Sequence, residues 1–494
     1  MEHMMMGFSL LFTFESLLMM VIGCVMGYLL GVMPGISATI ALALFIPFTF
    51  NMDVIPAIVL LICVYSAQNF GGGITSILLN TPGSPSAAAA VLDGYPLAKK
   101  GQAKKALGMQ IWASGVGEAS SAILLIVFSL SLATFALRFG PPEFFLLALM
   151  GLSVVAGLAA DNMVKGLIMA VIGMFLTTIG MDPIGGAFRY VASFYFLEGI
   201  PFIPALIGLF AISEVFVMIT EKAEGKQLVE ISGEGLTFEE FKSCKGPLTM
   251  GAGVGFLLGL VPAAGPNIAS WIAYSEAKRM SKNPENFGKG ELAGIAAPET
   301  ANNAAATGSL VPTLALGIPG SPPAAVLLGA LSLHGIAAGP LLFERNPEIP
   351  FTVFAVSLVI VPVLMAIGLF GARYFSLVSK APKTVIAPLI LATCTVGSFA
   401  IGGTMFGVWV AYIFGVIGYI LKRFNFPAPP LVLALVLGRL AESNFRRSML
   451  MSRGSLTIFF ERPITVVIMI LTVFMFAYPF IQSYIKKKKA AAGK

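Results

Sequence analysis

Residues 26–41 read MGYLLGVMPGISATIA, and residues 254–269 read VGFLLGLVPAAGPNIA. Seven of the sixteen positions are identical at a fixed offset of 228 residues, and the identities include two glycines and a proline. Chance similarity between apolar stretches does not also align glycines and prolines, so the pair indicates an internal duplication. The duplication is the feature that decides the fold, because each copy contains the same kind of broken apolar segment.

Two further pairs follow in the same order along the chain. Ser66-Ala67-Gln68-Asn69 is matched to Thr300-Ala301-Asn302-Asn303, and Pro82-Gly83-Ser84-Pro85 is matched to Pro319-Gly320-Ser321-Pro322. The apolar runs from Gly71 to Pro85 and from Gly308 to Pro323 are too short and too interrupted for ordinary spans. We therefore predict a helical hairpin that dips into the membrane in each half, with Pro-Gly-Ser-Pro at its turn.

The composition is that of a membrane protein. Of the 494 residues, 57% are hydrophobic and 11% are charged, and the mean hydropathy is +0.90. Soluble proteins carry about 25% charged residues, so we predict an all-α polytopic membrane protein with two repeats and additional scaffold helices. Apolar runs predict spans near residues 8–31, 36–50, 54–66, 106–137, 143–160, 163–180, 196–219, 248–275, 350–372, 384–401, 404–421 and 463–485.

The charged loops predict how the two repeats are oriented. The net charge is +7, and because lysines and arginines gather in short loops, we attribute it to the positive-inside rule rather than to nucleic-acid binding. The first Pro-Gly-Ser-Pro turn leads to the basic loop 99–105, whereas the second leads to residues 339–348, which hold one Arg and two Glu. Equivalent loops on opposite faces predict an inverted-topology repeat, and the basic tail 486–489 predicts a cytoplasmic C-terminus.

The only long polar stretch divides the chain almost in half. Residues 221–245 hold four Lys and six Glu and are predicted to be an exposed connector. The longer and less interrupted segments near residues 106–219 and 350–485 predict a rigid scaffold, and a core of about residues 26–97 and 254–338 is predicted to move against it. The predicted organisation is 1–220 for the first repeat with scaffold helices, 221–246 for the connector, 247–345 for the second repeat core, and 346–494 for C-terminal scaffold helices and the basic tail.

The two turns are the predicted substrate site. Pro82 and Pro319 end the first half-helix, Gly83 and Gly320 permit unusual backbone conformations, and the serines that follow can cap the returning half-helix. The N-terminus of a helix carries a partial positive charge and unpaired N–H donors, so it can hold a carboxylate without a cationic side chain. A single Pro-Gly-Ser-Pro sequence can equally be a tight loop at the end of a helix. Its occurrence at matching positions in both halves favours a binding site for an anion with more than one carboxylate.

Neutral polar residues around the turns suit a coupling cation such as Na⁺, although the same residue types also join helices in membranes. Glu299 is the candidate coupling carboxylate, with helix capping as the alternative, and Glu118 is expected to be paired within the bundle. Asn267 follows the Pro262 break, which also suits a simple kink. The predicted substrate-binding residues are Pro82, Gly83, Ser84, Pro319, Gly320, Ser321, Asn69, Asn302 and Asn303; the predicted cation-coupling residues, which could hold Na⁺, are Thr75, Thr81, Glu299, Thr307 and Asn267.

Motifs of enzymes are missing from the sequence. It contains no G-x-x-x-x-G-K-[ST] motif for ATP, no HExxH motif and no Cys/His cluster, and only two histidines. We therefore predict a transporter without enzymatic activity and without a cofactor other than the coupling ion, Na⁺ or H⁺.

Several blocks resemble a known family. Residues 281–290 (SKNPENFGKG), 296–306 (AAPETANNAAA), 316–321 (LGIPGS), 78–85 (LLNTPGSP) and 92–103 (LDGYPLAKKGQA) are similar to the large membrane subunit of the tripartite tricarboxylate transporters. The likeness extends over nearly the whole chain.

The resemblance implies a multi-pass permease of the bacterial inner membrane that imports a tricarboxylate-like anion, such as citrate, by cation symport. It also implies a small four-helix membrane subunit and a periplasmic solute-binding protein as partners, and no nucleic acid. Two alternatives stay open from the residues: an intramembrane enzyme that acts on a lipid-linked substrate with Glu299 as acid or base, and a scaffold subunit without a transport site.

Overall fold

Helices account for nearly all of the regular structure in the computed structural model, which describes residues 2–157, 163–182, 184–220, 228–262, 264–378 and 382–492. Among these residues, seven helices are long and apolar enough to cross a membrane, and five shorter apolar helices accompany them. Within the described residues the only sheet is a two-stranded antiparallel ribbon of β1 (Gly180–Met181) and β2 (Phe188–Arg189). The predicted all-α polytopic class is confirmed.

The first half differs from the predicted spans at two places. The span expected at 8–31 is two helices, because Thr13 caps the second one by accepting a hydrogen bond from Ser16 N–H (3.4 Å). The span expected at 54–66 continues to Leu79, since Gly71, Gly72 and Gly73 do not break it. The elements are α1 (Glu2–Leu11), α2 (Phe14–Gly31), α3 (Ala38–Thr49), α4 (Val54–Leu79), the 3₁₀ turn η1 (Pro85–Ala87), α5 (Ala88–Leu97), the π-helical turn η2 (Ala98–Gln102) and α6 (Ala103–Ala136).

The second half repeats this order in the described residues that follow the connector. The connector from residue 228 lies against the first half, where Val229 N–H donates to Leu78 O (3.0 Å) and Lys104 N–H donates to Ser232 O (3.1 Å). The elements are α11 (Phe238–Ser243), α12 (Lys245–Leu260), α13 (Gly265–Met280), η5 (Pro284–Asn286), α14 (Ala293–Gly308), α15 (Leu310–Leu316), α16 (Pro322–Leu333), α17 (Leu342–Arg345) and α18 (Glu348–Val378).

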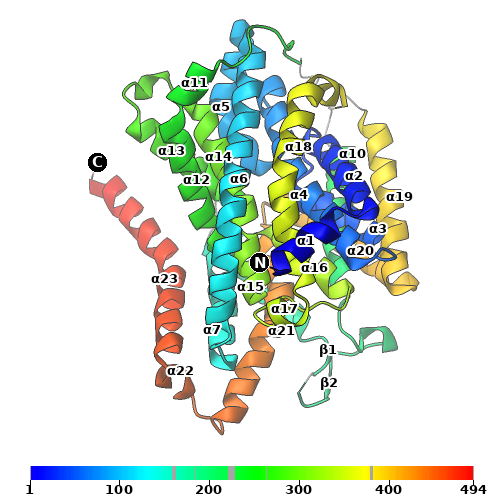
Figure 1. Cartoon of the computed structure of the whole chain (residues 1–494). Helices are drawn as coiled ribbons and strands as arrows, with labels where there is room; N and C mark the ends of the chain where they lie inside the picture. The colour runs from blue at the N-terminus through cyan, green and yellow to red at the C-terminus, as the bar shows by residue number, and fades with distance from the viewer. Residues whose placement is uncertain are drawn as a thin grey trace.

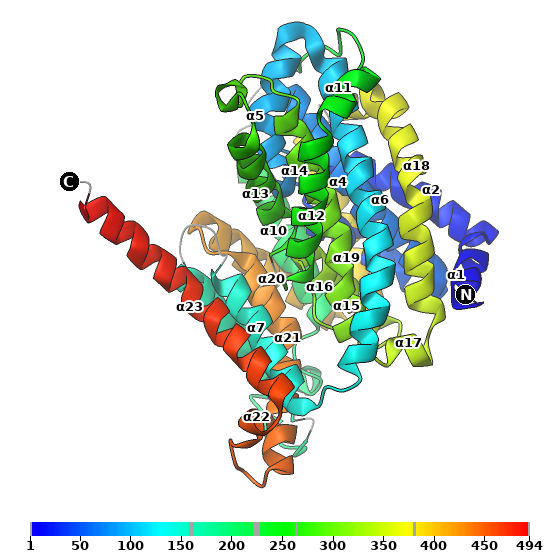
Figure 2. The same cartoon turned by 60° about the vertical axis from the view of Figure 1, so that its left-hand side comes forward.

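The remaining helices form a second bundle at the side of the two halves (Figures 1 and 2). The helix α21 was missed in the sequence because Arg439, Glu442 and Arg446 interrupt its apolar pattern; it packs against α7 and α8, and α23 packs against α7. The elements are α7 (Pro141–Gly157), α8 (Met163–Thr177), η3 (Phe194–Phe196), α9 (Phe202–Leu206), η4 (Ile207–Ile212), α10 (Ser213–Thr220), α19 (Lys383–Gly402), α20 (Met405–Arg423), α21 (Ala428–Met451), α22 (Ile458–Glu461) and α23 (Pro463–Ala492).

Matching rows of glycines join α2 to α4 in the first half and α12 to α14 in the second. An added Cβ at Gly27 on α2 would lie 2.7 Å from Val64 O on α4, and one at Gly255 on α12 would lie 2.5 Å from Ala301 O on α14. Val64 and Ala301 are 237 residues apart, which is also the spacing of the two Pro-Gly-Ser-Pro turns. Residues 66–69 were matched to residues 300–303 at an offset of 234, and this match was therefore wrong by three positions. A shift of three residues is close to one helical turn, so the two polar runs still lie on similar faces of their helices.

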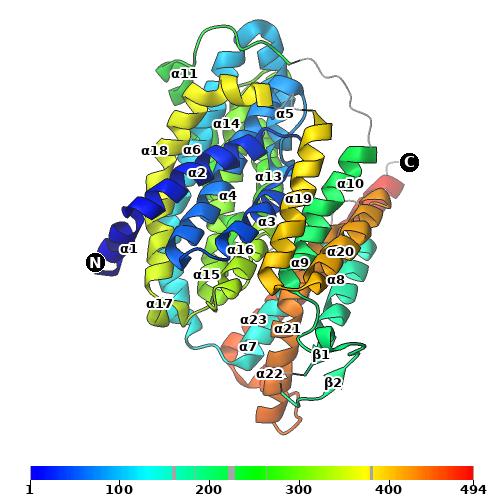
Figure 3. The ribbon, with the colours of Figure 1, turned by 90° about the vertical axis from the view of Figure 1, so that its right-hand side faces the viewer.

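The two halves interleave. The helix α4 of the first half packs against α18 of the second, and α14 of the second packs against α6 of the first. Likewise α3 contacts α16, and α13 contacts η1 and α5. The junction of α5 with α6 lies at the upper end of the two interleaved halves and α17 lies at their lower end, above α22 and the β1–β2 ribbon (Figures 1 and 3). An inverted repeat requires this placement of the two loops; inversion across a membrane, like the predicted domain boundaries, stays a prediction.

Candidate substrate and cation site

The first Pro-Gly-Ser-Pro turn is held by close backbone contacts. Asn80 ends α4 in the left-handed conformation (φ 53°). Gly83 N–H donates to Gly72 O (3.3 Å), and a Cβ on Gly83 would lie 2.2 Å from Gly31 O. The expected reason for Gly83 was therefore wrong, because its backbone is not left-handed; glycine is needed there because three backbone segments meet.

The second turn has the same construction. Gly317 ends α15 in the left-handed conformation (φ 69°), at the position that corresponds to Asn80. Gly320 N–H donates to Thr313 Oγ1 (3.3 Å), and a Cβ on Gly320 would lie 2.7 Å from Ser309 O and 2.9 Å from Gly259 O. The corrected reason for Gly83 thus applies to Gly320 as well.

The two serines differ in what they bind. Ser321 caps α16 as predicted, because its Oγ accepts a hydrogen bond from Ala324 N–H (3.3 Å). Ser84 makes no such bond; its hydroxyl pairs with that of Ser86 (2.8 Å), and the returning segment begins with the 3₁₀ turn η1. The capping role predicted for Ser84 is wrong because a 3₁₀ turn, not an α-helix, follows it.

Tyr65 connects the first half to the second turn. Its hydroxyl lies 3.3 Å from Ser321 Oγ and 3.4 Å from Ser309 Oγ, and these two serine oxygens are 3.1 Å apart. The sequence reasoning missed Tyr65; the signal was a tyrosine directly before the polar run 66–69. At the offset of 237 its counterpart is Asn302, whose amide nitrogen and oxygen are both buried and without a hydrogen-bond partner.

The other predicted polar residues fall into two groups. Asn69 Nδ2 donates to Tyr65 O (3.1 Å) and Asn303 Nδ2 donates to Glu299 O (3.0 Å), so each amide nitrogen is bound one turn back along its own helix. Thr75 and Thr81 also donate to backbone oxygens, those of Gly72 (3.4 Å) and Leu79 (3.2 Å). Asn267 is exposed at the start of α13 and lies outside the buried set.

Two carboxyl groups are buried between α4, α6 and α14. Glu299 lies inside α14, so it is not a capping residue. Its Oε2 accepts hydrogen bonds from Ser114 Oγ (3.1 Å) and Gln110 Nε2 (3.4 Å). Glu118 Oε1 accepts one from Ser66 Oγ (2.8 Å), and Thr307 lies beside the same carboxyl. Each carboxyl keeps one oxygen without a partner.

No cluster of three or more His, Cys, Asp or Glu side chains that could hold a metal ion occurs among the described residues. A cation at this site would therefore be held by hydroxyl, amide and single carboxyl oxygens, which are the ligands suited to Na⁺ or to a proton. The arrangement offers neutral hydrogen-bonding groups and two carboxyls that are buried inside the protein.

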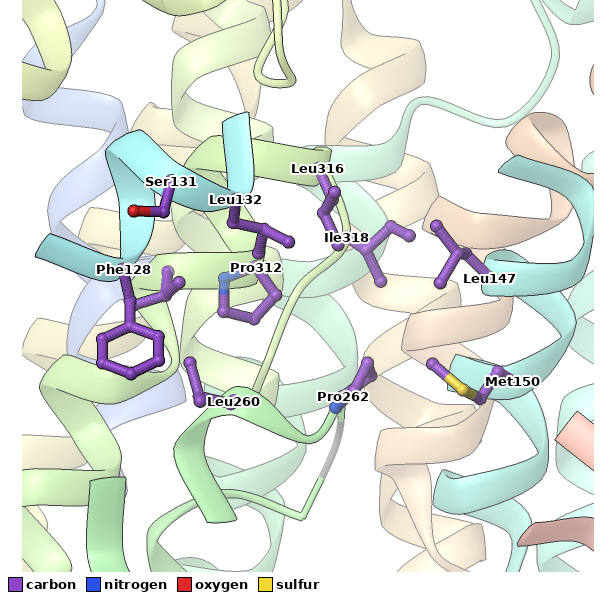
Figure 4. A pocket seen from close by; sticks show the side chains of 11 residues that line it. Phe128, Ser131, Leu132, Leu147, Met150, Leu260, Pro262, Pro312, Leu316 and Ile318 are labelled. Atoms are coloured by element: carbon purple, nitrogen blue, oxygen red, sulfur yellow. The ribbon is translucent and has the colours of Figure 1, made fainter. Parts of the chain in front are cut away.

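A separate apolar cavity of about 440 Å³ lies beside the second turn. Figure 4 shows Phe128 and Leu132 from α6, Leu147 and Met150 from α7, and Ile318 around it. Ser131 is the one polar side chain in its lining, and the turn serines are not part of it. The cavity thus lies between α6, α7 and the second turn, beside a hydrophobic cluster in which Ile318 and Leu147 both take part, and it is not a polar binding pocket.

The comparisons with known proteins agree with the motifs. Residues 17–433 match the model of the tripartite tricarboxylate transporter TctA family. An uncharacterized 52.8 kDa protein from the TAR-I ttuC′ 3′ region of Agrobacterium vitis is 34% identical over 467 residues, which cover 94% of this chain and 93% of that protein. An uncharacterized protein from the TAR-II ttuC′ 3′ region of the same organism is 38% identical over 212 residues, 42% of this chain and 87% of that protein.

No solved structure matches the chain. The family model nevertheless spans both halves with their Pro-Gly-Ser-Pro turns, and the longer relative extends over nearly the full length. The chain belongs to the tripartite tricarboxylate transporter TctA family.

Proposed function

We propose that this chain is the translocating subunit of a secondary transporter that imports a carboxylate together with a cation. The observation that carries the proposal is the pair of Pro-Gly-Ser-Pro turns, each with a glycine that has no room for a Cβ. Gly83 lies against α2 and α4, and Gly320 lies against α12 and the residue that follows α14.

Each turn leads into the N-terminus of a helix, whose positive dipole end favours a carboxylate. In the second turn this attraction comes from the dipole rather than from free N–H groups, because Pro322 and Pro323 have none and Ala324 N–H is bound by Ser321 Oγ. Two such turns suit an anion with two or more carboxylates, such as citrate.

The cation belongs to the buried polar groups around Glu299. Asn302 and Asn303 present oxygens without partners in the protein, next to a carboxyl that receives hydrogen bonds only from neutral side chains. Na⁺ or H⁺ bound there would neutralise the buried Glu299 carboxylate, which is costly in its ionised form. Cation binding should therefore be favourable before the substrate site switches from one side of the membrane to the other.

The partners follow from the family. We propose a small four-helix membrane subunit beside this chain and a periplasmic solute-binding protein that delivers the anion, with the whole system in the bacterial inner membrane. The basic loop 99–105 and the C-terminal tail would then face the cytoplasm.

Uptake into proteoliposomes that contain all three subunits tests the proposal. We expect labelled tricarboxylate to accumulate when a Na⁺ or H⁺ gradient points inward, and not when ATP alone is supplied inside. Uptake that requires ATP and does not depend on either gradient would contradict the proposal. Substrate turnover in detergent without any gradient would favour an enzyme instead.

A pair of glycine variants tests the turn itself. Gly320→Ala places a methyl group 2.7 Å from Ser309 O and should abolish uptake, whereas Gly253→Ala on α12 meets nothing within 4 Å and should keep it. Equal uptake by both variants at equal amounts of folded protein would rule out the second turn as part of the site.

A further inference from the structure

The buried carboxyl groups of the described residues are of two kinds. Asp93, Glu118, Glu143, Asp182 and Glu299 are all buried, with at most 5% of each residue exposed. In three of them, both carboxyl oxygens have partners. In Glu118 and Glu299, one oxygen is bound and the other has no hydrogen-bond partner.

Two of the three fully partnered carboxyls, Glu143 and Asp182, are held by an arginine. Glu143 binds Arg462 (2.9 Å), Gly140 N–H (2.7 Å) and the hydroxyl of Thr465. Asp182 binds Arg446 and the N–H groups of the turn that follows it. In each case an arginine supplies the opposite charge.

Asp93 has no cation, but it is satisfied completely. Its Oδ1 accepts the N–H groups of Gly288 (2.9 Å), Gly290 (2.8 Å) and Glu291 (2.8 Å), and its Oδ2 accepts the hydroxyl of Tyr274 (2.9 Å). Four donors stabilise the ionised form of a buried carboxylate. Asp93 is therefore a structural link between α5 and the loop before α14.

Glu118 and Glu299 have neither an arginine partner, as Glu143 and Asp182 have, nor hydrogen-bond donors on both oxygens, as Asp93 has. Their partners are all neutral side chains: those of Ser66 and Thr307 for Glu118, and those of Ser114 and Gln110 for Glu299. No Lys, Arg or His of the described chain forms an ion pair with them. An ionised carboxylate without a counter-charge is too costly in the interior of a membrane protein. Each of the two must therefore carry a proton or bind a cation.

The two carboxyls come from opposite halves at a tight contact. Glu118 is on α6 and Glu299 is on α14, and an added Cβ at Gly117 would lie 2.2 Å from Thr300 O. Ser114, one turn before Glu118, binds Glu299, so the two carboxyls are about one to two helical turns apart along the contact.

Asn303 is an independent observation that points to a ligand site, because its buried amide oxygen has no partner in the protein. It lies one turn after Glu299 and one turn before Thr307, which is beside Glu118, so the three side chains share a face of α14. Asn303 is fully buried, and its Oδ1 has no partner although its Nδ2 is bound. An amide oxygen with a free lone pair completes a cation site beside a carboxyl oxygen.

We propose that Glu118 and Glu299 each bind one monovalent cation, a proton or Na⁺, so that two positive charges enter with each substrate molecule. The inference rests on the proposed symport and adds Glu118 as its second coupling group. The other titratable groups facing Glu118 are Cys63 and Tyr65 on α4, and neither brings a positive charge. Glu299 faces Gln110 and Ser114, which are both neutral.

The number of cations is measurable on the unaltered three-subunit system. The membrane potential and the substrate gradient at which net flux reverses give the ratio of cation to substrate, and we expect a ratio of two. Separate series in Na⁺ at fixed pH, and in pH without Na⁺, distinguish the two cations. A ratio of one with gradient-driven uptake intact overturns the two-site inference, whereas no gradient-driven uptake at all overturns the proposed function.

Variants assign the two sites. In Glu118→Gln and in Glu299→Gln, we expect the Hill coefficient for the coupling cation to fall from about two to about one, since the coefficient is bounded by the number of sites. Glu143→Gln is the matched control, because this equally buried carboxyl is paired with Arg462 and should keep the wild-type Hill coefficient. If Glu118→Gln transports with unchanged cation dependence, Glu118 is not a coupling group. If that variant does not fold, the ratio of cation to substrate measured on the unaltered protein still tests whether two cations enter with each substrate molecule.

Discussion

At the scale of single residues, the polar chemistry of the second turn depends on a side chain from the other half. The hydroxyl of Tyr65 is within hydrogen-bond distance of both Ser309 and Ser321, which are more than 240 positions away in the sequence. The first turn has no equivalent, because Gly72 stands where Ser309 would be and Asn302 stands where Tyr65 would be. The two turns are thus alike in backbone and different in side chains.

We expect Tyr65→Phe to raise the KM for substrate several-fold, since it removes a hydroxyl from the second turn. The variant should also lose about 1 kcal/mol of stability, the usual net value of a buried hydrogen bond. Tyr28→Phe is the matched control, because Tyr28 donates to Leu364 O (2.7 Å) away from the turns. A similar rise in KM in both variants would show that Tyr65 acts only through stability.

At the scale of elements, the glycines of α2 and α12 determine how closely each half packs. At both Gly27 and Gly255 a Cβ would lie within 2.7 Å of a backbone oxygen on the facing helix. Backbone cannot yield as a flexible side chain can, so the helices would have to separate. Such close approach through small residues is the usual basis of helix association in membranes.

We therefore expect Gly27→Val and Gly255→Val to lower the thermal stability of the detergent-solubilised protein by similar amounts, because the two sites correspond in the repeat. Gly246→Val on α12 is the control, since nothing lies within 4 Å of its added Cβ. Loss of stability in the control alone, or in only one of the paired variants, would contradict the equivalence of the two packings.

The ribbon β1–β2 is attached to α21 by charge. The hydrogen bond from Arg446 is the main reason why the pKa of Asp182 falls to about 2, from a usual value near 4. A carboxyl with a lowered pKa stabilises the folded form above its usual pKa, and this contribution disappears as pH falls through the lower value. The attachment should therefore weaken as the pH falls from about 4 towards 2.

Limited digestion of the segment between β1 and α9 by an acid-tolerant protease measures this weakening. We expect cleavage of the wild-type protein to increase from pH 5 to pH 2.5, and the Asp182→Asn variant to be cleaved readily at both pH values. A wild-type ribbon equally resistant at both values would show that the Arg446 contact does not hold it.

At the scale of the whole molecule, the interleaving of the halves decides which helices can move together. The core expected from the sequence, about residues 26–97 and 254–338, leaves out α6. Yet Ser121 on α6 donates to Ala304 O on α14 (2.7 Å), and Thr300 on α14 donates to Ala113 O on α6 (3.1 Å). We infer that α6 belongs to the core, and that the boundary lies at the cavity between α15 and α7.

Crosslinks test this boundary. A short crosslinker between cysteines at Ser121 and Ala304 should leave transport intact, because both residues belong to the core. The same reagent between cysteines at Leu147 and Ile318, which face each other across the cavity, should stop transport (Figure 4). Full transport with the second crosslink would mean that α7 and the second turn do not move relative to each other.

The amino-acid sequence is sufficient to predict the membrane class, the internal duplication and the position of both turns. Hydropathy over about 20 residues, and the spacing of glycines and prolines, are local properties that survive without knowledge of the fold. For this reason Ser321 was correctly predicted to cap a helix. Helix α21 was missed for the same reason, because its charged residues interrupt the apolar run that a local search detects.

The tertiary structure alone decided which polar groups have partners. Ser66 with Glu118, Ser114 with Glu299 and Tyr65 with Ser321 are pairs separated by 52, 185 and 256 residues. Whether a buried carboxyl is satisfied depends on such distant donors, and no local pattern distinguishes Glu143, which meets Arg462, from Glu118, which meets no cation in the described residues. The role of Gly83 could not be predicted from local sequence either, because the backbone that it approaches belongs to α2.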